Sequence, residues 1–394
     1  MKPAVTSHKA VVILGGGLAG WCLFEHLLQQ GYAPEQLALV EKGVSARGAS
    51  GVLRGMLHPF TGRTLYPKPG AMEAFAYARS WLERLQTAYL QNHDAPFYTS
   101  SALWRIAVTQ DSQRQFERSF QRAQQELEHY PVSPQPMTTP LQHIHSAYVF
   151  PEAAHVNLSA LLAYLQQEHL SSCFLHQQDT VLKPDSRGWQ VKSRSLSLTA
   201  EHVVLAPGHE LSRFFPHVPL RTKRGEVILF ESPINLPVCV SGGGRYVVPL
   251  GVSKSTSAPL YRYIAGATFY RDDALWPPAQ AWQDLCSRLH WFPELEKAVP
   301  LQVWSGVRAT LHPDRQPLCG PVPGHERLWL MGAFSTRGLL QIPRHARALA
   351  QVLRAPADPS RLPPDSLPER VLRFKTSVRR QTQGEPEGVF ALLH

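Results

Sequence analysis

The first forty residues combine continuous apolar runs with a segment of helical spacing. Residues 10–14 and 37–40 are apolar throughout, a pattern typical of strands that are covered on both faces of a parallel sheet. Between them, apolar residues recur at helical spacing over 18–30, and Gly31 stands where a helix would stop. The pattern therefore predicts a strand, a helix and a second parallel strand.

The rest of the chain carries both patterns. Helical spacing predicts a helical block over 70–129, a helix over 157–167 with Asn157 as its N-cap, and a late helix over 343–353. Alternating, β-branched or aromatic residues predict strands at 189–193, 195–199, 202–205, 226–230, 246–250, 261–269 and 328–332. Proline-dense segments at 131–140 and 356–368 predict connections.

The turn between the first strand and the first helix is the most informative motif. Gly15 allows a tight turn, Gly17 lets the backbone approach a pyrophosphate, and Gly20 lets helix and strand pack closely. Glu41 ends the second strand, where its carboxylate would accept hydrogen bonds from ribose hydroxyls. This arrangement predicts binding of the adenosine half of a dinucleotide. The alternative is a glycine-rich turn that holds no ligand.

A second glycine cluster, Gly242-Gly243-Gly244, is followed by neither a helix nor an acidic residue, so it predicts a hairpin turn. The chain thus has one dinucleotide fingerprint, and it has no Cys-x-x-Cys pair. In a redox reaction, electrons would therefore come directly from a bound substrate.

The composition is that of a globular chain. With 394 residues, 43% hydrophobic and 18% charged, it is long enough for two domains or one large composite domain. No apolar stretch reaches the length of a membrane span and no signal peptide precedes the first strand, so we expect a cytoplasmic protein. The cysteines are scattered, and His143 and His145 lack acidic or cysteine partners at ligand spacing, so we expect no metal site.

The chain is basic, with a formal net charge of +10 and a pI near 9.5. Such a balance points to an anionic partner such as RNA. The alternative is that a cofactor pyrophosphate and a solvated basic tail account for it. The cations of that tail are Arg370, Arg373, Lys375, Arg379 and Arg380.

Several motifs occur in a characteristic order. They are the glycine turn, Ala49-Ser50-Gly51, Val203-Val204-Leu205-Ala206-Pro207-Gly208 and the segment from Gly332 to Pro343. In this order the chain resembles the D-amino-acid oxidase (DAO) superfamily of FAD enzymes from Val11 to Leu353. Three more motifs resemble glycine oxidase and the oxidase half of the bifunctional enzyme that makes 5-methylaminomethyl-2-thiouridine in tRNA. These are Arg224-Gly225-Glu226, Gly266-Ala267-Thr268-Phe269 and Thr336-Arg337-Gly338-Leu339.

The resemblance implies an α/β (α+β composite) fold, in which a Rossmann-like FAD-binding domain is interleaved with an antiparallel-sheet substrate domain. The implied FAD-binding domain is discontinuous and comprises residues 8–60, 150–224 and 305–355. The substrate or cap domain would comprise 61–149 and 225–304, and a proline-rich linker with a basic tail would follow over 356–394.

The resemblance also implies which residues hold non-covalent FAD. Glycines and neighbours of the first turn, the acidic strand end and the later loops would contact the cofactor: Gly15, Gly17, Leu18, Ala19, Gly20, Glu41, Lys42, Ser50, Gly51, Gly55, Met56, Gly208, Gly332, Thr336, Arg337, Gly338 and Leu339. Relatives with covalent flavin use a cysteine close to the position of Arg308, and none stands there in this chain.

Four residues are implied to act in catalysis. Arg308 would hold a substrate carboxylate, because a guanidinium fork offers two parallel charged hydrogen bonds. Arg337 and Gly338 would cross the flavin edge, and the late helix would stabilise negative charge on the reduced ring. His58 is a candidate for substrate contact, together with Arg63. For each side chain, a contact within the fold is the alternative.

The resemblance implies an FAD-dependent amine or amino-acid oxidase or dehydrogenase that moves hydride from the carbon next to an amine to flavin N5. An amino acid or an N-substituted glycine is the expected substrate. One alternative is a tRNA oxidase acting on a carboxymethylaminomethyl group, and another is a flavin-binding scaffold without turnover. Val52 departs from the tRNA enzyme, where Asn is common. The electron acceptor is oxygen or another oxidant, and Ile264 stands where some relatives carry a lysine that assists oxygen.

Overall fold

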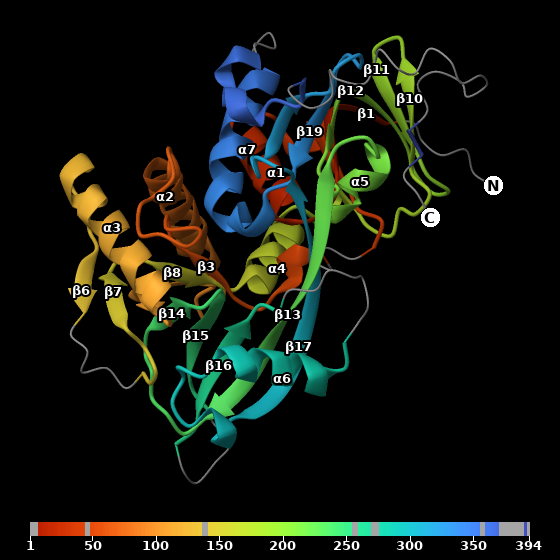
Figure 1. Cartoon of the computed structure of the whole chain (residues 1–394). Coiled ribbons are helices and arrows are strands. Elements are labelled where there is room, and N and C mark those ends of the chain that lie inside the picture. The colour runs from red at the N-terminus through yellow and green to blue at the C-terminus, as the bar shows by residue number, and fades with distance from the viewer. Residues whose placement is uncertain are drawn as a thin grey trace. The chain divides into compact units, whose positions relative to one another are not determined.

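The structure is a computed structural model, and it describes residues 7–43, 48–135, 141–253, 259–268, 276–354, 359–369 and the backbone of 390–391. The chain divides into two compact units. Unit 1 comprises Met1–Gly51, Ala160–Thr222 and Val307–His394, and unit 2 comprises Val52–Ser159 and Lys223–Gly306. These bounds lie close to the expected ones at 224 and 305, and they assign 52–60 and 150–159 to the second unit. Figure 1 labels most of the elements.

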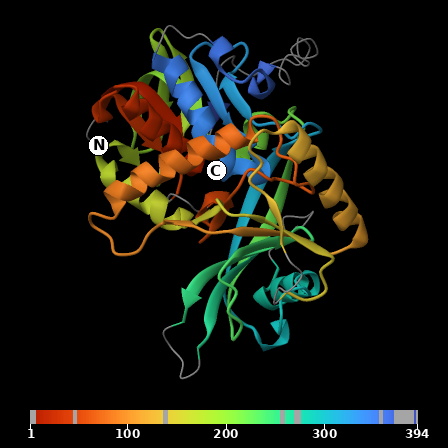
Figure 2. The ribbon, with the colours of Figure 1, turned by 90° about the vertical axis from the view of Figure 1, so that its left-hand side faces the viewer.

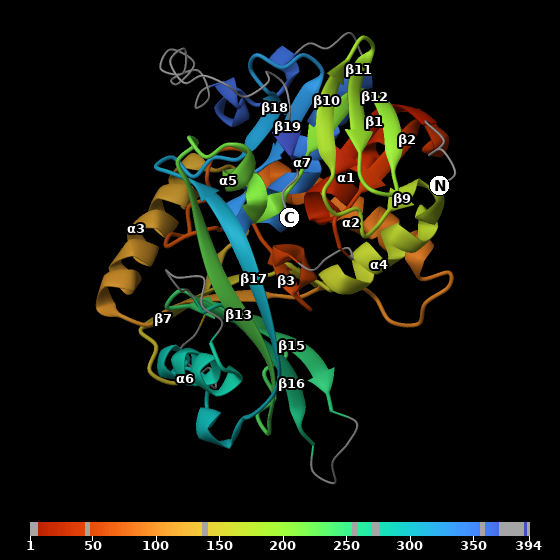
Figure 3. The ribbon, with the colours of Figure 1, turned by 90° about the vertical axis from the view of Figure 1, so that its right-hand side faces the viewer.

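Unit 1 is built on a mixed sheet with a parallel centre, seen in Figure 3. The sheet order is β20-β10-β11-β12-β1-β2-β9, and β19 pairs with both β12 and β18. Strands β1, β2, β9, β12 and β19 are parallel where they pair with one another, whereas β11 and β18 pair antiparallel with β12 and β19. The bounds are β1 Ser7–Leu14, β2 Leu37–Val40, β9 Cys173–Phe174, β10 Val181–Asp185, β11 Gly188–Lys192, β12 Ser197–Leu205, β18 Leu318–Pro321, β19 Leu328–Gly332 and β20 Phe390–Ala391.

Helices cover this sheet because its central strands are apolar on both faces. Val11, Val12 and Ile13 of β1 are all fully buried. Helices α1 (Leu18–Gln29) and α7 (Gly338–Arg354) lie side by side (Figure 1). Shorter helical pieces are α4 Leu158–Glu168, which crosses the boundary between the units, and α5 Leu211–Phe214. No helix of the described residues is long and apolar enough to cross a membrane.

Unit 2 contains a larger, mainly antiparallel sheet and a small one. Strands β13 and β17 of the larger sheet cross the unit boundary, so 220–222 and 307–311 belong to unit 1. The order of the larger sheet is β17-β13-β16-β15-β14-β5-β7-β6, and that of the small sheet is β3-β8-β4. The bounds are β3 Gly55–Leu57, β4 Tyr98–Ser100, β5 Leu103–Ala107, β6 Ser133–Gln135, β7 Ser146–Phe150, β8 Ala154–Val156, β13 Leu220–Ser232, β14 Cys239–Gly242, β15 Arg245–Val252, β16 Tyr261–Gly266 and β17 Val299–Leu311.

Three helices belong to unit 2: α2 Ala71–Tyr89, α3 Gln110–Glu126 and α6 Pro278–Arg288. Helix α6 contributes Ala281 and Leu285 to a core shared with Ile228 and Phe230 of β13. Figure 2 shows this helix beside the strands of unit 2. The apolar face of this amphipathic helix therefore completes the core formed by the sheet.

The structure corrects several expected elements. The block over 70–129 is not helical throughout, because β4 and β5 separate α2 from α3. The strands expected at 195–199 and 202–205 form one strand, β12, which continues across Glu201. The late helix begins at Gly338 and contains Pro343. Pro343 removes one main-chain hydrogen bond near the start of α7. The burial of apolar side chains along this helix offsets that loss.

Other expectations agree with the structure. The predicted hairpin at Gly242–Gly244 joins β14 to β15, and Gly243 and Gly244 have φ of 58° and 77°. Asn157 directly precedes α4. One expectation differs from the structure: 131–140 was expected to be a connection, but β6 forms over 133–135. Phe269 and the tail cations from Arg370 to Arg380 lie outside the described residues.

Candidate functional site

The glycine turn follows β1 directly and is shaped by close main-chain approaches. Gly15 has φ of 122°, and a Cβ there would lie less than 3.0 Å from the carbonyl of Ala206. A Cβ on Gly20 would lie equally close to the carbonyl of Gly15. No other residue fits these two positions without moving backbone. These two glycines are therefore required by the turn itself, whatever it binds.

Gly17 differs from its neighbours because the protein leaves space beside it. It is the N-cap of α1, it has φ of −81°, and it supplies no side-chain cap. Among the described residues, a Cβ there would meet only Ser50 Oγ, at 3.4 Å. A helix N-terminus with no side chain in front of it is an anion site. The residues present therefore fit the pyrophosphate of a dinucleotide.

The Ala49–Gly51 turn is joined to the same helix start. Ser50 Oγ accepts a hydrogen bond from the amide of Leu18 at 3.0 Å. Gly51 donates its amide to the carbonyl of Gly48 at 3.0 Å, which closes the turn. The structure thus brings Ser50 and Gly51 to the glycine turn, and Ala19 follows in the first turn of α1.

Glu41 ends β2 beside this turn. Its Oε2 accepts from the amide of Gly16 at 2.7 Å and its Oε1 accepts from the amide of Gly43 at 3.1 Å. These bonds fix the carboxylate at the carboxyl edge of the parallel strands, where α/β sheets bind nucleotides. Lys42 pairs instead with Glu210 in the segment after Gly208. Gly208 has φ of 61°, and no described atom lies within 4 Å of a Cβ there.

A second helix start lies in unit 1 after β19, which ends at Gly332. A short 3-10 helix, Ser335–Arg337, contains Thr336 and leads directly into α7 at Gly338 and Leu339. Because α7 begins at Gly338 and not at Pro343, its positive end lies within the predicted flavin-edge loop itself.

Arg308 lies on β17, two residues before Thr310, which contacts this loop. Thr310 shares its face of the strand, because residues two apart in a strand point the same way. Thr310 Oγ1 and Ser335 Oγ are 3.0 Å apart, and Thr310 also bridges to Phe334. The strand therefore places Arg308 on the same face as the residue that contacts the turn before α7, two residues earlier along β17.

Arg337 has a different environment. Its guanidinium donates to the carbonyl of Arg315, and only 6% of the residue is exposed. Burial lowers the pKa of Arg337, while Asp365 and Asp314 act in the opposite direction. These contacts favour the structural role that the sequence left open. The nearby Cys319 on β18 is buried, and burial raises the pKa of its thiol to about 12.

The remaining predicted residues, Gly55, Met56 and His58, lie in unit 2. Gly55 and Met56 belong to β3 and pair with Val156 and His155 of β8. Burial, together with the charge of Arg105, lowers the pKa of His58 to about 3, so the imidazole is neutral at physiological pH. A neutral imidazole offers one donor and one acceptor and no charge.

Two buried polar groups of unit 2 had no assigned role in the sequence. Glu226, which is 1% exposed, accepts hydrogen bonds from the hydroxyls of Thr268 and Ser305, and Arg224 donates to Ser305 at 3.1 Å. The Arg224–Glu226 and Gly266–Phe269 motifs mark this cluster only through their resemblance to relatives. The second group is Arg105, which no motif identifies.

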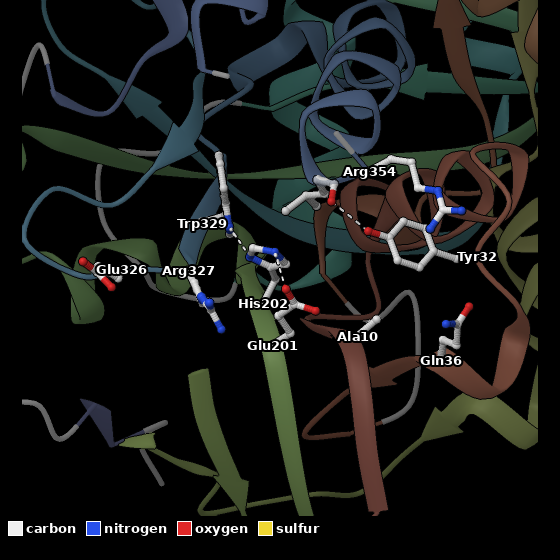
Figure 4. Close-up of a pocket in the computed structure, with 10 residues that line it drawn as sticks. Ala10, Tyr32, Gln36, Glu201, His202, Glu326, Arg327, Trp329 and Arg354 are labelled. Carbon is white, nitrogen blue, oxygen red and sulfur yellow. Dashed lines mark hydrogen bonds and ion pairs between the residues drawn. The ribbon is translucent and has the colours of Figure 1, made fainter. Parts of the chain in front are cut away.

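A polar pocket of about 620 Å³ lies elsewhere in unit 1 (Figure 4). Its wall includes Ala10 of β1, Glu201 and His202 of β12, and Arg354 at the end of α7. Trp329 donates its indole N–H to His202 at 3.2 Å. None of the predicted site residues lines this pocket. Ala10 precedes the carboxyl end of β1, so the pocket is separate from the glycine turn.

A family model described as DAO, FAD dependent oxidoreductase, matches residues 10–352. The tRNA 5-methylaminomethyl-2-thiouridine biosynthesis bifunctional protein MnmC of Marinobacter nauticus is 29% identical over 88% of this chain and 56% of that protein. The chain thus spans about half the length of this relative. Glycine oxidase of Pseudomonas aeruginosa is 26% identical over 88% of this chain and 94% of its own length.

Among solved structures, glycine oxidase from Geobacillus kaustophilus aligns with a TM-score of 0.74 and 22% identity. The alignment covers 90% of this chain and 96% of that one. This likeness concerns the fold, and it confirms the predicted mixed α/β architecture.

Proposed function

We propose, from the premise that this chain belongs to the DAO family of FAD dependent oxidoreductases, that it oxidises a carbon–nitrogen bond of an amino acid or an N-substituted glycine. Family membership confirms the predicted resemblance, FAD as the cofactor and an oxidoreductase as the class of enzyme. The similarity to glycine oxidase over nearly the whole of that protein supports an amino-acid substrate.

The placement of Arg308 carries the proposal. It stands on β17 on the same face as Thr310, whose hydroxyl lies 3.0 Å from that of Ser335 in the turn where α7 begins. FAD, when bound, supplies an acceptor for the hydride. Arg308 would bind the substrate carboxylate through two parallel hydrogen bonds and so orient the carbon next to the amine. The amide dipoles at the start of α7 would favour negative charge close to Gly338.

The role of Arg308 is tested by mixing the FAD-loaded protein rapidly with glycine and N-substituted glycines in the absence of oxygen. We expect bleaching of the flavin absorbance in the wild type. Arg308→Ala should lower the second-order rate constant of flavin reduction, because the carboxylate loses a charged pair, and should leave FAD content unchanged. The expected loss corresponds to about 2 to 4 kcal/mol of transition-state stabilisation. The exposed arginine Arg221 provides a control, since Arg221→Ala should react normally.

Unchanged efficiency in Arg308→Ala would remove this residue from the site. If no amine bleaches the flavin, the result would favour the alternative of a flavin-binding scaffold without turnover.

A second candidate function is oxidation of a carboxymethylaminomethyl group on tRNA. It is favoured by the similarity to the MnmC protein of Marinobacter nauticus and by the net charge of +10. Bleaching by tRNA, with an affinity that falls steeply as salt rises, would support this candidate. Bleaching by free amino acids alone would exclude it.

A further inference from the structure

Arg105 on β5 is a buried cation of unit 2. The residue is 5% exposed, its Nη2 donates to the carbonyl of Gly62 at 2.8 Å, and its Nη1 donates to the carbonyl of Phe60. No carboxylate of the described residues lies within ion-pair distance of it. Arg245 is equally buried but pairs with Asp284 at 3.1 Å. A buried charge without a counter-charge is costly, so Arg105 calls for an explanation.

Buried polar atoms without hydrogen-bond partners accompany this cation. They are His58 Nδ1, Thr61 Oγ1, Arg105 Nε and Ser146 Oγ, none of which bonds to a described atom. Such atoms are rare in folded proteins and usually mark a bound water, a ligand or a functional site. We call these four residues the Arg105 cluster.

The four residues lie together in unit 2. Thr61 stands between Phe60 and Gly62, whose carbonyls bind the Arg105 guanidinium. Ser146 is opposite Ala107 in the β5–β7 pair and shares its face of the sheet with Arg105. His58 is close enough for the charge of Arg105 to lower its pKa.

The chemistry of the cluster is that of an anion site. Arg105 Nε carries a proton, both hydroxyls can donate, and neutral His58 can donate from Nδ1. The cluster contains no carboxylate, and burial raises the pKa of nearby Tyr130, so that phenol is not a counter-ion. The four polar atoms are buried, but His58, Thr61 and Ser146 are partly exposed as residues, so the cluster lies close to the surface of unit 2.

We propose that the Arg105 cluster binds a small monovalent anion, either a carboxylate of the size of formate or a halide. The anion would neutralise Arg105 and accept hydrogen bonds from Thr61 and Ser146. This inference does not depend on the proposed function, because it concerns binding within unit 2 alone.

Thermal unfolding of the FAD-loaded protein tests the proposal, with sodium formate replacing sodium gluconate at constant ionic strength. Gluconate is too bulky for the cluster, so formate should raise the Tm to a plateau. Thr61→Val keeps Arg105 and its carbonyl bonds but removes one donor. It should raise the half-saturating formate concentration at least fivefold. The exposed Thr87 is the matched control, and Thr87→Val should behave as the wild type.

A second measurement is the pKa of His58 by NMR, which should rise when formate binds because Arg105 is then neutralised. Sodium chloride distinguishes the two sources of the anion. A plateau with chloride at similar concentrations indicates recognition of charge, and a plateau with formate alone indicates recognition of a carboxylate. Equal Tm in formate and gluconate would overturn the proposal, as would a formate plateau that Thr61→Val leaves unchanged.

Discussion

Two turns in this molecule are held in opposite ways. The glycine turn of unit 1, residues 15–20, is fixed by main-chain atoms that approach Gly15 and Gly20 too closely for any side chain. The turn of unit 2 that begins at His58 is fixed by Arg105, 45 residues beyond Phe60, through bonds to main-chain carbonyls. The first turn therefore depends on the absence of side chains, and the second depends on one buried side chain.

The two turns differ in what fixes them, which is steric fit in the first turn and electrostatics in the second. Around the glycine turn, amides and the carboxylate of Glu41 satisfy one another before any ligand is present. Around the second turn, Arg105 lacks a carboxylate partner among the described residues, and its Nε and several neighbouring polar atoms have no hydrogen-bond partner. Substitutions in the first turn should therefore act through steric fit, on the fold at Gly20 and on the cofactor site at Gly17. Substitutions in the second turn should act through electrostatics.

Gly20→Ala should have the largest effect. Its Cβ would collide with the carbonyl of Gly15, so β1 and α1 must separate. We expect a loss of more than about 3 kcal/mol in the free energy of unfolding and no measurable FAD binding. Urea unfolding and flavin absorbance measure both. Gly48→Ala is the control, because a Cβ at Gly48 meets nothing within 4 Å. Equal stability of the two variants would contradict the close approach.

Gly17→Ala should act on the cofactor and not on the fold. Its backbone is in an ordinary conformation and its Cβ would meet only Ser50 Oγ, at 3.4 Å. We expect a loss of about 1 to 2 kcal/mol in FAD affinity, because a methyl group would occupy the space of the pyrophosphate and disturb its hydrogen bonds. Titration of the apoprotein with FAD measures it. Unchanged FAD affinity would show that the pyrophosphate does not lie against Gly17.

The same difference decides how much the sequence could predict. In unit 1, the strand, the turn, the helix and the acidic strand end are contiguous, and each leaves a local signature in residue type. Gly15, Gly17 and Glu41 were therefore identified as a group. The start of α7 was placed too late, because Pro343 is a favoured first residue of a helix and nothing local excluded that position.

In unit 2, the relevant contacts join distant segments, so no local pattern reports them. Arg105 lies in an apolar strand, where its isolated charge gave no sign of the turn that it binds. The buried Glu226 was visible only as part of a motif, and its partner Ser305 lies 79 residues away. Strands β4 and β5 were missed because they are short and stand between two helices with strong periodicity.

The smallest predicted effect is the response of unit 2 to acid. Burial and the charge of Arg54 lower the pKa of His155 from 6.5 to about 4, and its Nδ1 accepts from Arg54 Nη1 at 3.4 Å. Because the unfolded chain takes up this proton first, stability is lost as the pH falls from about 6.5 towards 4. At pH 5.5 the loss from His155 should be about 1 kcal/mol.

His155→Gln keeps an acceptor but cannot titrate. It should therefore reduce the loss of unfolding free energy at pH 5.5, measured by urea unfolding, by that amount, and the exposed control His217→Gln should not. If both variants show the wild-type dependence of unfolding free energy on pH, the acid response of unit 2 comes from groups other than His155.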